Sequence, residues 1–126
     1  MKYEEMNKRN IDSGLYPVTS FVDGPDTYEV TSDANRDDAC LTGMNATLRV
    51  YDIHEECTCE HPFRVEMETD YAIDFNVISC FRNYLEEADQ SDKMDLMEII
   101  QGDNALEIDT TDPDGNPITL NVMPEL

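Results

Sequence analysis

Alternation of apolar and polar residues is clearest in the middle of the chain. In residues 63–71, Phe63, Val65, Met67 and Tyr71 share one parity, and charged residues occupy most of the positions between them. This period of two predicts a strand whose sheet has one dry face and one acidic, solvated face.

A second strand is predicted over residues 46–54, although its pattern is less regular. Leu48 and Val50 alternate with polar residues as a half-buried strand requires. Tyr51 and Ile53 then take the other parity. A change of parity within one strand indicates a β-bulge near Tyr51.

From residue 72 the apolar period changes to three and four residues. Residues 72–89 are therefore predicted to form an amphipathic helix, with its apolar positions at Ile73, Val77, Cys80, Phe81, Tyr84, Leu85 and Ala88. Ser91 is a suitable N-cap for a second, shorter helix, and Gly102 is suited to end it.

Shorter apolar runs flank this central part. Residues 15–22 and 27–31 are predicted to be strands joined by a turn, and residues 32–45 are predicted to be a long connection. After the helices, residues 106–108 and 118–122 are predicted to form the arms of a hairpin, because the segment between them is rich in Asp, Pro, Gly and Asn.

These elements predict an α+β fold: a mostly antiparallel sheet with two helices packed on one face, in the order strands–helix–helix–hairpin. Residues 15–126 are expected to be a single acidic domain, since 126 residues supply one modest core. Residues 1–14 are a polar N-terminal segment that ends in a breaker pair, which allows it to be flexible.

Charge changes this picture more than any motif does. The chain has 29 Asp and Glu against 8 Lys and Arg, a formal net charge of −21. Residues 86–126 carry twelve acids and one base, whereas residues 1–14 are balanced. Such an excess destabilises a compact state by self-repulsion, so we expect the acidic surface to serve the function.

The acids also recur at regular steps. On a strand, alternate carboxylates stand about 6.6 Å apart, and on a helix residues three apart are neighbours. The candidate partner-binding residues that share this spacing are Glu66, Glu68, Asp70, Glu86, Asp89, Asp92, Asp95, Glu98, Glu107 and Asp109.

Rows of carboxylates can engage the Lys and Arg side chains that otherwise contact a phosphate backbone. In composition the chain is similar to the small acidic DNA-mimic inhibitors of phages and mobile elements, including anti-restriction and anti-CRISPR proteins. That resemblance implies an inhibitor that occupies the basic groove of a CRISPR effector, a restriction enzyme or another nuclease, and it assigns no role to any single residue.

Two other readings of the acidity stay open. An acidic adaptor or antitoxin could bind one basic protein without mimicking DNA. A halophilic domain would also be rich in Asp and Glu, but seven Met, four Cys and a balanced N-terminal segment are less expected there.

A metal site is the lesser alternative. Cys57, Cys59 and His61 would point the same way on an extended chain, and zinc favours such ligands. Common structural zinc sites use CxxC pairs, however, and here there is one CxC. Residues 109–116 lack the first and last ligands of an EF-hand loop, so they are predicted to be a turn.

Enzymatic activity and a cofactor are not expected, because the chain has no P-loop, GxGxxG, GxSxG or HExxH motif. Direct binding to nucleic acid or to an anionic membrane is not expected either, since it would need a basic surface. The start of the chain lacks an apolar signal region, and the protein is expected in the cytoplasm of a bacterial host cell.

Overall fold

The computed structural model describes residues 16–34, 41–69 and 75–124. Its elements, in chain order, are β1 (Tyr16–Asp23), β2 (Asp26–Ser32), β3 (Gly43–Tyr51), β4 (Cys57–Glu68), α2 (Val77–Glu87), α3 (Gln90–Gln101), β5 (Leu106–Thr111) and β6 (Pro117–Pro124). The N-terminal segment 1–14, Asp70, Tyr71 and Ile73 lie outside the described residues.

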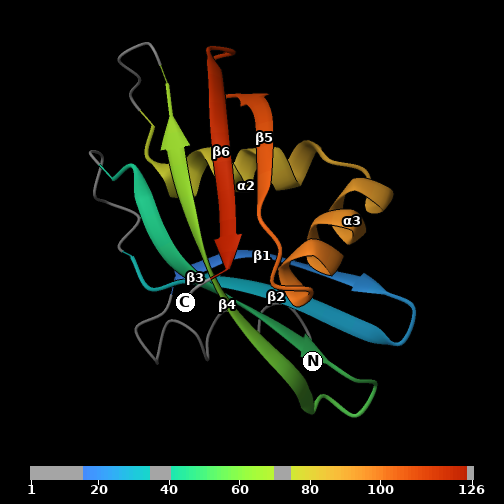
Figure 1. Cartoon of the computed structure of the whole chain (residues 1–126). Coiled ribbons are helices and arrows are strands. Elements are labelled where there is room, and N and C mark those ends of the chain that lie inside the picture. Colours follow the sequence, from blue (N-terminus) through green and yellow to red (C-terminus); the bar gives the residue numbers. More distant parts are fainter. Residues whose placement is uncertain (1–15, 35–40, 70–74, 125–126) are drawn as a thin grey trace.

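All six strands belong to one antiparallel sheet of order β1-β2-β3-β4-β6-β5. The sheet curls into a half-barrel, and α2 and α3 lie on its inner side (Figure 1). Strong curling follows from the right-handed twist that accumulates between neighbouring strands.

The predicted order strands–helix–helix–hairpin is wrong, although the protein is α+β. The chain runs strands, helices, strands, and its last two strands are integral to the sheet rather than a terminal hairpin. β6 pairs with β4 as well as with β5, for example through Met67 and Leu120. Local turn signals predict the β5–β6 turn, but they carry no information about this pairing between distant segments.

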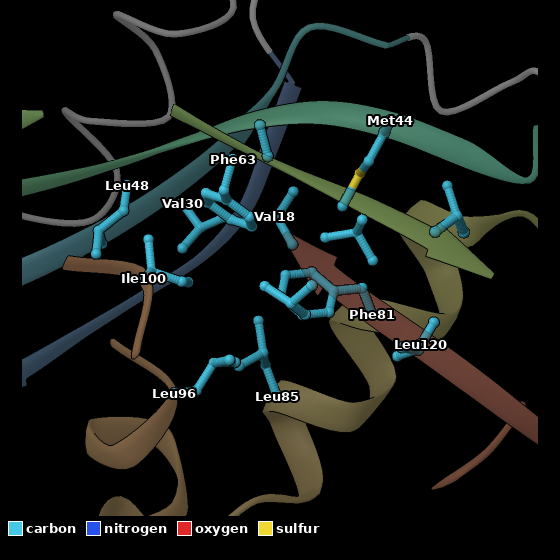
Figure 2. Packing of buried hydrophobic residues seen from close by; sticks show 14 of the residues in the cluster. Val18, Val30, Met44, Leu48, Phe63, Phe81, Leu85, Leu96, Ile100 and Leu120 are labelled. Carbon is cyan, nitrogen blue, oxygen red and sulfur yellow. The ribbon is translucent and has the colours of Figure 1, made fainter. Parts of the chain in front are cut away.

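The core fills the inner side of the half-barrel. Residues of every strand belong to one hydrophobic cluster with Phe81 and Leu85 of α2 and Leu96 and Ile100 of α3. Figure 2 shows part of this cluster. Phe81 meets Phe63 of β4 edge to face, with ring centroids 6.3 Å apart. Helices and sheet therefore share one hydrophobic core, and the outer face of the sheet is left for polar side chains.

The strand pattern of β4 is confirmed. Phe63, Val65 and Met67 are buried, whereas Glu66 and Glu68 are exposed. The predicted bulge also occurs, but the extra residue lies in β4, because Val50 pairs with Cys59 and Tyr51 pairs with Cys57.

Both helices begin at positions other than those predicted. α2 starts at Val77, where the Asn76 side chain accepts a hydrogen bond from the Ser79 amide. α3 is capped by Asp89 rather than by Ser91, since the Asp89 carboxylate accepts from the Asp92 amide at 2.8 Å. Asp and Ser are comparable N-caps, so their sequence preference alone does not decide between these positions.

Candidate functional site

Four of the candidate acids lie together on the outer face of the sheet. Residues paired across an antiparallel sheet face the same side. Glu66 and Glu107 both pair with Asn121 of β6, and Glu68 and Asp109 both pair with Thr119. We call these four acids the sheet quartet: Glu66, Glu68, Glu107 and Asp109. The two acids on β4 and the two acids on β5 form separate rows. These rows are two strand spacings apart, about 9.6 Å, because β6 lies between β4 and β5.

Neighbouring polar groups hold parts of this quartet. The Arg64 guanidinium contacts Glu66 at 2.8 Å and donates to the Asn45 side chain at 3.0 Å. A Cβ at Gly43 would lie 2.6 Å from the Arg64 side chain, so the absence of a side chain there leaves room for it. The Thr119 hydroxyl donates to Asp109. Arg64 therefore offsets part of the negative charge of this face.

Shallow depressions lie beside the quartet. One of about 410 Å³ includes Glu66 and Glu107 in its lining, and one of about 510 Å³ includes Asp109. Glu68 borders both. The outer face thus presents carboxylates at fixed steps around open hollows, which suits contact with extended basic side chains.

The candidate acids of the helices form a separate group. We call Asp89, Asp92, Asp95 and Glu98 the helix row; all four are exposed. Three residues along an α-helix advance about 4.5 Å along its axis and rotate by about 300°, which is about 60° less than a full turn. The row therefore winds around α3 instead of occupying one straight face.

The helix row lies close enough to Tyr84, near the end of α2, to affect its ionisation. Burial raises the pKa of the Tyr84 hydroxyl, and the charges of three helix-row residues raise it further: Asp92, Asp89 and Asp95. Glu86 differs from them, because it pairs with Arg82 at 3.2 Å on α2. Negative potential is accordingly concentrated at the start of α3.

The structure does not bring the sheet quartet and the helix row together. Leu96, Met97 and Ile100 of α3 pack into the core on the inner side of the sheet. The quartet lies on the outer side. The predicted acids thus divide into two surfaces separated by the sheet.

A third acidic region, which the sequence analysis did not single out, lies at one end of the sheet. Val22 pairs with Thr27, and Thr27 pairs with Tyr51, so the β1–β2 and β3–β4 turns lie at the same end (Figure 1). We call this region the hairpin end, and its residues are Val22, Asp23, Asp26, Asp52, Ile53, Glu55 and Glu56.

The hairpin end adjoins the helix row. The Gln90 side-chain amide donates to the Val22 carbonyl at 3.0 Å and to the Asp23 carboxylate at 3.4 Å. Lys93 lies over the Phe21 ring, 5.5 Å from its centroid. The start of α3 is therefore fixed beside the β1–β2 turn, which makes the helix row and the hairpin end neighbours. The sequence feature that could have indicated the hairpin end is Ile53, an apolar residue with acids close to it on both sides.

The zinc candidates do not form a ligand set. Cys59 and His61 follow the inward parity of β4, whereas the bulge pairs Cys57 with Tyr51 and turns it to the other face. Burial and then Glu60 raise the pKa of the Cys57 thiol, which disfavours the thiolate that binds metal. Residues 16–34, 41–69 and 75–124 contain no group of three His, Cys, Asp or Glu placed to hold a metal ion.

Cys80 is a core residue. It lies fully buried in α2, and burial, followed by the charge of Asp112, raises the pKa of its thiol to about 11. It is therefore protonated at neutral pH and unsuited to metal binding or nucleophilic chemistry.

The turn predicted over residues 109–116 is confirmed only for residues 112–116, because residues 109–111 belong to β5. The Asp112 carboxylate accepts hydrogen bonds from the amides of Asp114 and Asn116, both at 2.9 Å, and from the Asn116 side chain. Burial alone would raise the pKa of Asp112, but these hydrogen bonds outweigh it and lower the pKa below its ordinary value. The Asp112 carboxylate thus stabilises the turn by accepting these hydrogen bonds.

None of the helices in the described ranges combines the length and the apolar character needed to cross a membrane. Comparison of the chain with protein-family models, with curated proteins and with solved structures finds no match.

Proposed function

We propose that this protein is an acidic nucleic-acid mimic. It inhibits a nucleic-acid-binding protein by occupying its basic groove, in the manner of an anti-restriction or anti-CRISPR protein. The observation that carries the proposal is the placement of carboxylates at regular steps on rigid elements, with the sheet quartet on two strands and the helix row on α3.

The spacing supports this function. Along one DNA strand the charges recur about every 3.4 Å. Carboxylates recur about every 4.5 Å along the axis of α3 and about every 6.6 Å along β4 and β5. Lys and Arg side chains are long enough to absorb such differences in spacing.

The distribution of positive charge supports it as well. Among the described cations, each arginine has an acidic partner: Arg49 with Glu60, Arg64 with Glu66 and Arg82 with Glu86. Lys93 covers Phe21. Each of these ion pairs joins one base to one acid, and the excess of acids over bases gives the net charge of −21 that a basic partner would meet.

The test uses purified DNA-binding nucleases, including a guide-loaded CRISPR effector and a restriction enzyme. Their DNA binding is measured with and without the protein at about 50 and 200 mM salt. We expect the protein to suppress DNA binding by at least one nuclease, less so at the higher salt, because neutralised charges make such binding salt-dependent. Suppression of none would contradict the proposal, and binding to a nuclease that still binds DNA normally would indicate an adaptor.

Three matched variants locate the contact, each removing four negative charges. The sheet variant is E66Q/E68Q/E107Q/D109N, the helix variant is D89N/D92N/D95N/E98Q, and the control is D33N/E87Q/D103N/D114N. If only net charge mattered, the three would weaken inhibition equally. A specific surface requires the sheet or the helix variant to weaken it more than the control does.

A further inference from the structure

Two large hydrophobic side chains remain exposed in the described part of the chain, and both belong to the hairpin end. Val22 is 62% exposed at the end of β1, and Ile53 is 73% exposed in the β3–β4 turn. The pairing of Thr27 with Tyr51 brings these turns to one end of the sheet. Val22 and Ile53 therefore lie at the same end of the sheet.

The turn that carries Ile53 is closed by hydrogen bonds of Asp52. The Asp52 carboxylate accepts hydrogen bonds from the His54 amide at 2.8 Å and the Glu56 amide at 3.1 Å. The Asp52 carbonyl accepts from the Glu55 amide, and Glu55 has a positive φ of 63°. Because the turn is already ordered, Ile53 could bind a partner without the entropy cost of ordering a loop.

The surroundings of Ile53 are acidic. Asp52, Glu55 and Glu56 flank it in its own turn, and Asp23 and Asp26 lie at the neighbouring turn. Asp89, the first residue of the helix row, precedes Gln90, which contacts Asp23. An apolar centre with a charged rim is the usual anatomy of a protein interface. Here the sign of the rim matches a basic surface.

We propose that Ile53, assisted by Val22, is the apolar anchor of the complex, inserting between the basic side chains of the partner's nucleic-acid groove. This inference rests on the proposed function. It assigns the contact to the hairpin end together with the helix row, and it leaves the sheet quartet outside the interface. The charges then govern the rate of association, and the anchor governs the residence time.

The test measures association and dissociation rates on the nuclease that the wild-type protein inhibits. We expect Ile53→Ser to raise the dissociation rate about tenfold, as loss of an interface anchor does, with the association rate within about twofold. Ile53→Leu, which keeps the apolar volume, should dissociate within about threefold of the wild-type rate. Thermal unfolding should be unchanged in both variants, because Ile53 is largely exposed.

The outcomes separate the two proposals. If the wild-type protein inhibits a nuclease and Ile53→Ser dissociates at the wild-type rate, the anchor is overturned and the proposed function stands. If the wild-type protein inhibits none, the proposed function fails and the anchor fails with it. If the wild-type protein forms a dimer that Ile53→Ser disrupts, while dissociation from the nuclease is unchanged, the occupant is a second copy of this chain and the anchor is likewise overturned.

Discussion

The sheet quartet and the hairpin end are both acidic, yet they differ in their apolar side chains. The quartet lies on β4 and β5, where Arg64 pairs with Glu66. Neither of these strands has an exposed large hydrophobic residue. The hairpin end lies on two turns and combines its acids with Val22 and Ile53. Charge alone steers encounter, whereas desolvated apolar contact slows dissociation. Under the proposed function we therefore expect the two acidic surfaces to contribute differently to binding.

The largest expected effect is on the core that supports both regions. Phe81→Ala removes a fully buried ring that packs on Phe63, and such truncations cost about 3–5 kcal/mol. Urea denaturation should show this loss. The variant should also inhibit less, because it lowers the population of the folded protein. Full inhibition by a largely unfolded variant would mean that the β3–β4 turn acts without the fold.

A smaller effect is expected at the junction of the helix row and the hairpin end. Asp89→Ala removes the N-cap of α3 and should cost about 1 kcal/mol of unfolding free energy. Asp89→Asn should recover most of it, since Asn caps as well as Asp does. Equal denaturation midpoints for the two variants would show that charge, rather than capping, is the contribution of Asp89.

The smallest effect is expected on the outer sheet face. Arg64→Gln removes an exposed ion pair, with the two side chains 40% and 50% exposed, and should change stability by less than about 0.5 kcal/mol. If the hairpin end makes the contact, the association rate should stay within about twofold of wild type. A clearly faster association would instead place the sheet quartet in the interface.

Local patterns in the sequence predicted part of this structure well. The alternation in β4 identified its buried residues, and the change of parity near Tyr51 identified a bulge. The helical period identified α2 and α3, and Gly102 ends α3 as predicted, although the N-caps of both helices were not identified. Each of these features depends on residues within a few positions of one another.

Features that depend on distant segments were not predictable in the same way. Nothing near Met67 indicates that Leu120 pairs with it, so the place of β6 was missed. The division of the acids into two surfaces follows from that pairing and from the side on which α3 packs. The hairpin end was missed because its two turns are brought together by the pairing of β2 with β3.

The place of β6 also governs how the protein folds. β4 has its neighbour β3 early in synthesis, but its other edge stays open until β6, its partner through Glu68 and Thr119, has been made. Closing so long a loop is entropically costly and slows folding. The hairpin end thus uses strands that are neighbours along the chain, whereas the sheet quartet requires β6 to pair with β4 across the two intervening helices.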